Sequence, residues 1–443
     1  MSQSTHTHLR GKRGKEFADQ IRGIPMDQIL CVSLDIGKYF HVAMIHNALG
    51  DIVTPACEID FLQHGFDQLH QAIDRATAQT QAQLVLVGME PTSHYFENLA
   101  RHLIQRSQPV RLINSFAVSK NRDQQMMHRE KTDEIDTAAI GDLLRRGEGT
   151  LYRPPTGVYL QLQHLDRVRL SKIKMRSMLK NQILGHLDRI FPGLVITDDA
   201  ARARHTPVFV TNFWCCQTLQ HLIRVCPDPH RLSSMSGQEL TAAFHTAGYS
   251  LGPARAAKII ALAQSVLLPD PELVAIRAEL LQHDLALLEV VEHHISLLEE
   301  REIALLAPTP YLIWTRLKGL SPIQVASLAA AIGDPAHYAY AGQVFRRSGL
   351  VSGRDDSGTR QRKGKGKGVT KTGDVYLRRA LLCALSTLLV HQPVLGGYYH
   401  RLKQSKPAGV ARVATARRAL GILWATLRDQ RPTTLVLRKG VTM

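Results

Sequence analysis

The stretch Ile29-Leu-Cys-Val-Ser-Leu-Asp35 decides the fold, because it is an almost continuous apolar run of strand length that ends on an acid. A run of this kind predicts a buried strand. A second run, Leu84-Val-Leu-Val-Gly-Met-Glu90, has the same form. The two runs therefore predict the middle of a sheet, with an acid at the end of each central strand.

The segments around these runs complete a predicted sheet. We expect strands at Ile29–Ile36, Phe40–His46, Asp51–Ile59, Leu84–Met89 and Val110–Asn114. Residues 47–50 form the turn between the second and third strands, and helical segments separate the later ones. A three-strand meander followed by strand–helix alternation is the order of a ribonuclease-H-like α/β domain. In that fold the central strand carries the first acid, and the adjacent parallel strand carries the second.

This arrangement predicts that four acids lie close together: Asp35, Glu90, Asp133 and Asp136. We call them the acid tetrad. The last two lie in the segment 131–147, which has helical periodicity, and residues three apart share one face of a helix. Four carboxylates at one point repel one another unless divalent cations lie between them. The acid tetrad is therefore a candidate site for two-metal phosphoryl transfer, with Mg²⁺ or Mn²⁺ as the metal.

The positive charge of the chain lies in its C-terminal third. The formal net charge is +17, and residues 307–443 hold 23 Lys and Arg against five Asp and no Glu. The rest of the chain is thus nearly neutral. This asymmetry predicts a polyanion partner for the C-terminal third, and nucleic acid is the commonest polyanion in a cell.

The first 26 residues are polar and basic and do not have the pattern of a signal peptide. The longest apolar stretch, Ala380–Val390, is too short to cross a bilayer. We therefore expect a soluble cytoplasmic protein, in which residues 1–28 form a flexible basic leader and residues 29–150 form the ribonuclease-H-like domain.

Two long helices are predicted in the middle region, 151–306. One spans Leu160–Phe191, after the break at Pro154-Pro155, and the other spans Glu272–Leu306. Residues 194–268 form an insertion between them without a clear motif. The pair predicts an antiparallel coiled-coil arm, and two ordinary bundle helices are the alternative that the pattern leaves open.

The region 307–443 is predicted to be a basic helical domain. Residues 317–334 have the pattern of a helix-hairpin-helix element, whose turn could bind a phosphate, although such a turn more often only connects two helices. Within 348–379, the alternation of Gly and Lys predicts a cationic loop that binds phosphates without reading bases. Its predicted nucleic-acid-binding residues are Arg354, Arg360, Arg362, Lys363, Lys365, Lys367, Lys371, Arg378 and Arg379.

Ser357 stands directly in front of these cations and is followed by Gly358. A serine hydroxyl among fixed positive charges is a candidate nucleophile toward a phosphodiester. A serine in a polar loop is usually only a turn residue, and composition alone favours that simpler interpretation.

Taken together, the motifs resemble those of the DEDD-type insertion-sequence transposases, the IS110 family of site-specific recombinases. The resemblance covers two blocks, 30–150 and 310–428, and its motifs occur in the same order as in the family. The matching pieces are Leu34-Asp-Ile-Gly-Lys38, Gly88-Met-Glu-Pro-Thr92, Lys131-Thr-Asp-Glu-Ile-Asp136, Ser357-Gly358, Thr370–Arg379 and the helical segment Val410–Leu420.

The resemblance implies roles for individual residues. It implies a RuvC-like domain whose metal-binding acids are Asp35, Glu90, Asp133 and Asp136, and a second domain whose nucleophile is Ser357. It further implies one composite active site, a phosphoserine–DNA intermediate, the recombination of element DNA into a target, and a structured guide RNA from the end of the element. We expect a homo-oligomer, a dimer or tetramer, associated with the nucleoid in a prokaryotic cell.

Three other interpretations compete with this one. A RuvC-like junction-resolving endonuclease would need the acid tetrad but would use water instead of serine. An actin-like ATPase or sugar kinase would fit Asp35-Ile-Gly37, but it also requires a second such strand and a Gly-Gly motif, which are missing from suitable places. A non-catalytic nucleic-acid scaffold would leave the complete acid tetrad without a purpose.

Overall fold

The structure is a computed structural model that describes residues 11–125, 132–196, 213–350 and 373–428. The chain divides into two compact units, Met1–Pro154 and Pro155–Met443. Each unit has cores of its own and is described by itself.

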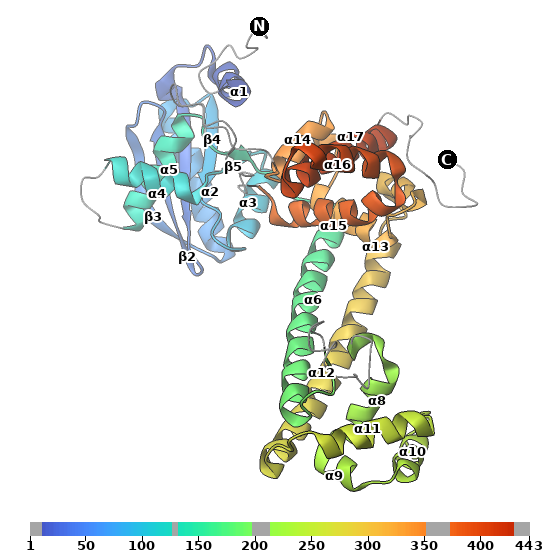
Figure 1. Ribbon diagram of the computed structural model, residues 1–443. Coiled ribbons are helices and arrows are strands. Elements are labelled where there is room, and N and C mark those ends of the chain that lie inside the picture. The colour runs from blue at the N-terminus through green and yellow to red at the C-terminus, as the bar shows by residue number, and fades with distance from the viewer. Residues whose placement is uncertain (1–10, 126–131, 197–212, 351–372, 429–443) are drawn as a thin grey trace. The chain divides into compact units, whose positions relative to one another are not determined.

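The first unit is built on a six-stranded sheet with the order β3-β2-β1-β4-β5-β6 (Figure 1). β1 (Ile29–Ile36), β2 (Phe40–Asn47) and β3 (Ile52–Asp60) form an antiparallel meander. β4 (Leu84–Met89) pairs with β1 in parallel, and β5 (Val110–Leu112) pairs with β4 in parallel. β6 (Thr150–Leu151) closes the far edge in the antiparallel direction. The predicted ribonuclease-H-like order is confirmed.

Helices cover both faces of this sheet. On one face, α2 (Gln63–Thr80) and α3 (Phe96–Gln105) pack against the even-numbered residues of β1, such as Leu30 and Val32. On the other face, α5 (Asp133–Arg145) and α1 (Gly11–Ile21) pack against the odd-numbered ones, such as Ile29 and Cys31. α4 (Ser115–Gln125) packs beside α5. Successive side chains of a strand point to opposite faces, so β1 divides its residues between the two layers.

Residues 1–28 were predicted to be a flexible leader, and the structure differs there. Residues 11–21 form α1, and Phe17 is buried among Ile29, Cys31 and Leu144. The reason is that the aromatic ring of this short amphipathic helix packs into an apolar cluster formed by the sheet and α5. Residues 1–10 lie outside the described part of the chain, and the domain boundaries predicted at 28, 150 and 306 remain a proposal.

The second unit contains two long helices that pack along each other, α6 (Gly157–Ile190) and α12 (Pro271–Ala304). Ion pairs join Lys180 to Glu292 at 3.0 Å and His186 to Asp284 at 3.4 Å. Because the residue number falls on one helix as it rises on the other, the helices are antiparallel, as Figure 1 shows. The predicted helical middle is confirmed, and α6 begins three residues and α12 one residue before the predicted start.

Short helices form residues 213–265, the main described part of the insertion for which the sequence offered no motif. They form a small lobe whose core includes residues of α6 and α12, for example Ile183 and Leu281. The elements are η2 (Phe213–Cys215), α8 (Gln217–Val225), α9 (Pro229–Ser234), α10 (Gly237–Thr246) and α11 (Pro253–Ser265).

A helical bundle forms the C-terminal part of the second unit. Its turn at Gly319 lies against Thr387 and His391, so the structure gives this turn a packing role between helices. The bundle comprises η3 (Pro310–Arg316), α13 (Pro322–Ile332), η4 (Pro335–His337), α14 (Ala341–Arg347), α15 (Val375–His391), α16 (Pro393–Ser405) and α17 (Ala408–Arg428).

A buried ion-pair network ties the long helices to this bundle. Arg169 of α6 donates to Glu302 of α12 at 2.9 Å, to Asp166 at 2.5 Å and to Ser327 of α13 at 2.6 Å. Burial raises the pKa of Glu302 to about 7, while the charge of Arg169 opposes that shift. Arg169 therefore offsets only part of the cost of burying two acids in one place, because the pKa values of Glu302 and Asp166 both stay raised.

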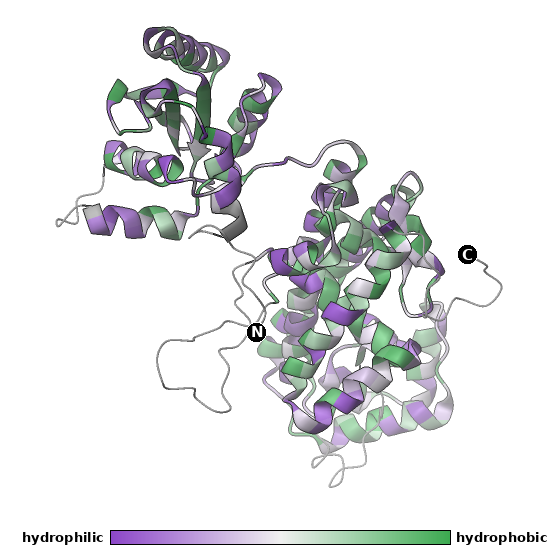
Figure 2. Cartoon of the chain, turned by 90° about the horizontal axis from the view of Figure 1, so that it is seen from above, coloured by the Kyte–Doolittle hydropathy of each residue, from purple (hydrophilic) through white to green (hydrophobic). Residues whose placement is uncertain are grey.

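Most helices bury one face and expose the other, and Figure 2 shows hydrophobic and hydrophilic residues on the same helices. Within the described residues, no single helix is long and apolar enough to cross a membrane. The pair α15 and α16 passes that test jointly by length and composition, but it is bent by 103°. Leu377, Leu381, Leu385 and Leu395 of this pair are buried in the bundle core.

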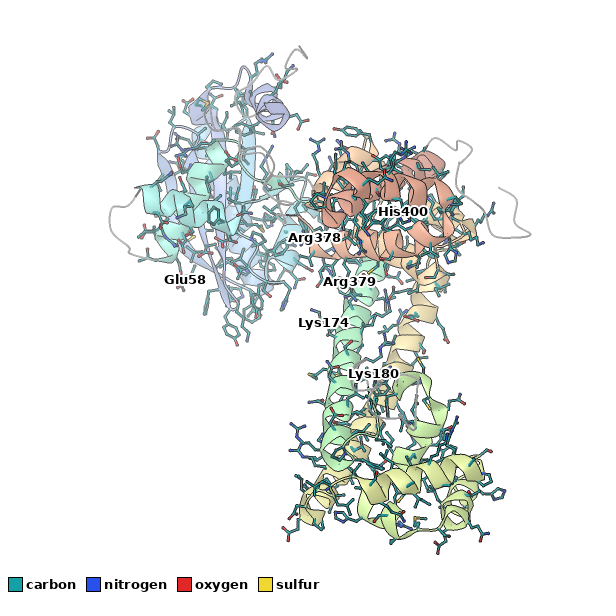
Figure 3. All side chains as sticks on the ribbon, in the orientation of Figure 1. Glu58, Lys174, Lys180, Arg378, Arg379 and His400 are labelled. Atoms are coloured by element: carbon teal, nitrogen blue, oxygen red, sulfur yellow. The ribbon has the colours of Figure 1, made fainter. Side chains whose placement is uncertain are left out.

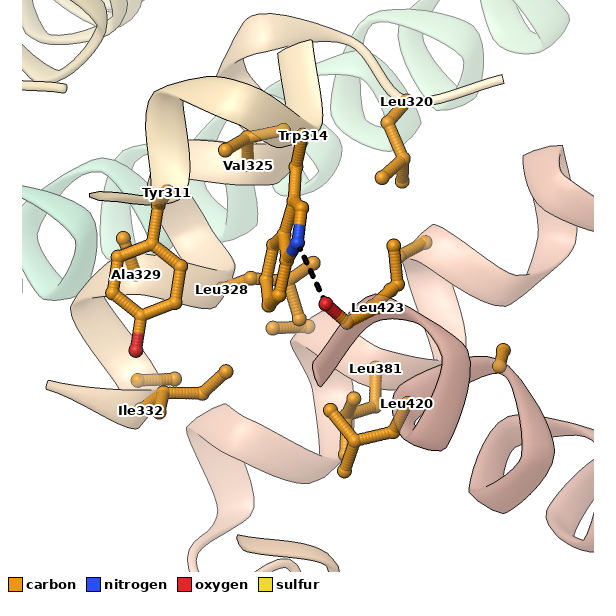
Figure 4. Packing of buried hydrophobic residues seen from close by; sticks show 14 of the residues in the cluster. Tyr311, Trp314, Leu320, Val325, Leu328, Ala329, Ile332, Leu381, Leu420 and Leu423 are labelled. Carbon is orange, nitrogen blue, oxygen red and sulfur yellow. Dashed lines mark hydrogen bonds between the residues drawn. The ribbon is translucent and has the colours of Figure 1, made fainter. Parts of the chain in front are cut away.

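Trp314 is fully buried in that core, and its indole nitrogen donates to the Leu423 carbonyl and to Thr426, each at 3.1 Å (Figure 4). We expect Trp314→Ala to lower the free energy of unfolding by about 3–5 kcal/mol, because it leaves a large cavity in the core and removes the hydrogen bonds that the indole nitrogen donates. Urea unfolding of the helical circular dichroism signal measures this loss. Leu312→Ala is the matched control, since Leu312 lies on the same short helix and is 43% exposed. Equal unfolding midpoints for the two variants would contradict the expectation.

Candidate active site

The strands present two of the acids on one face of the sheet. Asp35 is an odd-numbered residue of β1, so it points to the layer that holds α5 rather than to that of α2 and α3. Glu90 follows β4 directly, and its amide donates to the Leu34 carbonyl, which holds it beside the end of β1. Both side chains are half-buried. The ends of two neighbouring parallel strands therefore carry one acid each.

α5 brings the other two acids to the same place. The helix begins at Asp133, and the hydroxyl of Thr132 accepts from the amide of Ile135 and so caps its N-terminus. Asp133 is exposed, whereas Asp136, one turn later, is only 6% exposed. Two glycines allow α5 to lie close to the sheet, since a Cβ at Gly141 would come within 2.2 Å of His46, and one at Gly88 within 3.0 Å of Leu144.

The charges of the four acids act on one another. Burial raises the pKa of Asp35 to about 6 together with the carboxylates of Asp136, Glu90 and Asp133, which contribute in that order of strength. A hydrogen bond from the amide of Ile36 opposes the shift. Carboxylate oxygens are the donors that Mg²⁺ and Mn²⁺ prefer, so the chemistry of the acid tetrad fits a divalent cation.

Arg122 is a member of this site that the sequence did not suggest. Its Nη1 donates to Oδ1 of Asp136 across the contact between α4 and α5. No group of three His, Cys, Asp or Glu side chains within the described residues is gathered closely enough to hold a metal ion in this arrangement. Nothing in the spacing of the sequence relates residue 122 to residue 136, because that pairing depends on how the two helices pack.

Most of the predicted cationic loop lies outside the described residues, together with Ser357. This applies to Arg354, Arg360, Arg362, Lys363, Lys365, Lys367 and Lys371. The described residues on either side of it are joined. The amide of Asp374 donates to the Arg347 carbonyl at 2.7 Å, and Arg347 pairs with the Asp374 carboxylate at 3.0 Å. The chain thus leaves and re-enters the bundle at one place.

The two described cations of the predicted set lie near the start of α15, where Figure 3 labels both. Arg378 is half-buried, and its Nη1 donates to the Ser348 carbonyl at 3.2 Å. Arg379 is also half-buried and acts electrostatically on Asp166. Arg378 therefore holds the base of the loop in place, which is a structural task in addition to the predicted one.

Further basic side chains are exposed on α16 and α17, and the sequence analysis did not single them out. The segment 393–428 contains no acid. Some of its cations are steadied by neighbours: Arg412 donates to Ser386 at 3.0 Å, and Arg418 lies 4.4 Å from the Tyr398 ring centroid. The uniform positive charge of this segment was the feature of the sequence that could have indicated these residues. The exposed residues are Arg401, Lys403, Lys406, Arg412, Arg417 and Arg418.

Comparison with known proteins agrees with this organisation. The family model of DEDD transposases of the IS110 type matches residues 32–192, and the model described as "Transposase IS116/IS110/IS902 family" matches residues 313–400. The two matches together cover more than half of the chain. The chain belongs to the IS110-type transposases.

A curated relative of this transposase is the "Insertion element IS116 uncharacterized 44.8 kDa protein" of Streptomyces clavuligerus. The two are 29% identical over 317 residues, which is 68% of this chain and 72% of the relative. The first family match contains the whole acid tetrad, and the second contains Ser357. The predicted family is confirmed, and the protein is a DNA-processing enzyme rather than an actin-like ATPase, a sugar kinase or a non-catalytic scaffold.

Proposed function

We propose that this transposase cuts and rejoins DNA with Ser357 as nucleophile and with divalent metal held by the acid tetrad. The observation that carries the proposal is the electrostatic coupling within the acid tetrad, in which the carboxylates of Asp136, Glu90 and Asp133 raise the pKa of Asp35. Asp35, Glu90, Asp133 and Asp136 would hold Mg²⁺ or Mn²⁺. When bound, such a metal would polarise the scissile phosphate and lower the pKa of a nearby hydroxyl.

The protein groups perform two phosphoryl transfers in this proposal. In the first, Oγ of Ser357 releases its proton and bonds to phosphorus, one phosphorus–oxygen bond to deoxyribose breaks, and the departing oxygen takes up a proton. In the second, a deoxyribose hydroxyl of another strand attacks the phosphoserine, and Ser357 is regenerated. The backbone charge of both strands is balanced by the cations from Arg354 to Arg379.

A structured RNA encoded by the element is the proposed guide. The net positive charge of residues 307–443 and the exposed cations on α16 and α17 support a second nucleic-acid partner besides DNA. Neither the net positive charge nor the exposed cations distinguish one base from another. The choice of target would therefore come from base pairing of the guide rather than from side chains.

The proposal is tested with the full chain, a plasmid that carries joined element ends, and Mg²⁺. A serine mechanism produces a protein–DNA adduct that survives denaturant and recombinants that retain every nucleotide. The runner-up, a junction-resolving endonuclease, produces nicked four-way junctions and no adduct. Cleavage of junctions without any adduct would favour water as the nucleophile.

We further propose that the transposase works as a homo-oligomer through α12. Apolar residues recur on an exposed face of this helix at the spacings of a coiled-coil seam, although each is 38–54% exposed in the single chain. A second copy of the same helix is the partner that such a heptad stripe fits. The stripe consists of Leu273, Ile276, Leu280, Leu287, Val290 and Leu297.

We expect Leu287→Glu with Val290→Glu to convert the oligomer to a monomer, because buried like charges oppose a seam of this kind. Light scattering at micromolar protein should then give the mass of one chain, about half or less of the unmodified value. Leu267→Glu is the control, since Leu267 is 92% exposed and lies outside the stripe. An unchanged mass for the double variant would remove α12 from the interface.

A further inference from the structure

The ion pair between Arg122 and Asp136 lies inside the acid tetrad. The Arg122 side chain is 21% exposed and that of Asp136 is 9% exposed, so solvent screens the pair only partly. The contact is end-on, with Nη1 donating to Oδ1. One of the four candidate metal ligands therefore has a protein cation as its partner.

Arg122 is held beside the acid tetrad by the packing of α4 on α5. The side-chain amide of its neighbour Asn121 donates to the Ala139 carbonyl at 3.1 Å, and Asn121 is buried. Val118, one turn earlier, is fully buried against Ala139, Ile140 and Leu143. Because Val118 and Asn121 attach α4 to α5 directly before Arg122, the guanidinium stays near the site even if it leaves Asp136.

The same ion pair competes with metal binding. A carboxylate oxygen that accepts from a guanidinium is not available to a divalent cation, and the two cations would repel each other at this distance. Asp136, Glu90 and Asp133 all act electrostatically on Asp35, so Asp136 without Arg122 would add one more uncompensated negative charge to these acids. Arg122 thus lies beside the carboxylate that a metal ion would contact, and it carries a charge of the same sign as the metal.

We propose that Arg122 is the resting counter-ion of the acid tetrad: a divalent cation displaces it from Asp136, and the freed guanidinium then binds a DNA phosphate. This inference rests on the proposed function, because it takes the acid tetrad as the metal site. The planar fork of arginine suits a phosphate as well as a carboxylate. Metal binding and DNA binding would therefore be linked through one side chain.

The first part of the proposal is that a divalent cation displaces Arg122 from Asp136. Calorimetric titration of the metal-free full chain with MnCl₂, at fixed pH and without DNA, tests it. We expect Arg122→Gln to bind Mn²⁺ roughly tenfold more tightly, because the metal no longer has to break a charged hydrogen bond. Lys120→Gln is the matched control: it removes one positive charge from the same helix, but Lys120 is exposed and pairs with Asp123 at 3.2 Å. Its Mn²⁺ affinity should change by less than about twofold.

Measurements of DNA binding test the second part of the proposal, that the freed guanidinium of Arg122 binds a DNA phosphate. Anisotropy of a labelled duplex, at constant ionic strength with and without MnCl₂, measures how much the metal strengthens DNA binding. We expect that gain to be several-fold smaller in Arg122→Gln than in the unmodified protein and in Lys120→Gln. An equal gain in all three proteins would show that Arg122 does not transfer to DNA.

Two further variants separate the possible failures. Asp35→Asn should weaken Mn²⁺ binding. If it does not, the proposed metal site itself is wrong. If it does, and Arg122→Gln binds Mn²⁺ no more tightly than the unmodified protein, only the role of Arg122 is wrong. Arg122→Met, which keeps the aliphatic stem, repeats the test if the Gln variant does not fold.

Discussion

Asp35→Asn is expected to abolish strand cleavage in Mg²⁺ while the affinity for DNA stays within about twofold. The substitution keeps the shape of the side chain and removes one charged oxygen donor from the acid tetrad. Loss of partners that merely orient a ligand already costs 10- to 100-fold in comparable sites, so loss of a ligand should cost at least about 100-fold in cleavage rate. Denaturing gels measure cleavage, and gel shifts at one salt concentration measure affinity.

Glu134→Gln is the control for this experiment. Glu134 lies between Asp133 and Asp136 on the first turn of α5, is exposed, and loses the same charge. It should cleave at nearly the rate of the unmodified protein. Full cleavage by Asp35→Asn in magnesium would contradict the metal assignment.

The fold should survive this substitution. Burial and three acids raise the pKa of Asp35 to about 6, above its value in the unfolded chain. A carboxyl group whose pKa is higher in the folded than in the unfolded protein lowers the stability of the fold as the pH rises from its unfolded pKa through its folded pKa. The charge of Asp35 therefore opposes folding at pH 7. Metal-free Asp35→Asn should therefore melt no lower than the unmodified protein, and a lower melting temperature would indicate a structural defect.

Ser357→Ala is expected to bind DNA with nearly unchanged affinity but to form no denaturant-resistant protein–DNA adduct. A serine hydroxyl is a poor nucleophile at neutral pH unless a base or a nearby positive charge stabilises its anion. Since Ser357 is the proposed nucleophile, removal of its hydroxyl should reduce recombination to background. Gel electrophoresis in denaturant measures the adduct, and sequencing of the plasmid junctions measures recombination.

Ser352→Ala is the matched control, since it removes a hydroxyl from the same segment and should still form the adduct. Ser348 is a poorer control, because its buried hydroxyl donates to the Phe345 carbonyl at 2.6 Å and accepts from the Leu350 amide at 3.3 Å. Recombination by Ser357→Ala would make water the nucleophile and support a junction-cutting nuclease.

The sequence by itself determined the architecture of the first unit and the position of its acids. Apolar runs that end in Asp35 and Glu90 fix which strands are central, and the alternation of a strand fixes the face on which each side chain lies. The spacing of Asp133 and Asp136 on a helix likewise placed both on one face. The strand alternation and the helical spacing are local periodicities, so they can be recognised in a single sequence.

Only the tertiary structure decided which elements meet. The pairing of Arg122 with Asp136, the burial of Phe17 on the sheet and the joining of Arg347 to Asp374 each depend on contacts between segments far apart in the chain. The short helices between 213 and 265 could not be predicted, because segments of three to thirteen residues carry few repeats of a 3.6-residue pattern. Packing of this kind is set by the shapes and charges of complete surfaces, which no local pattern contains.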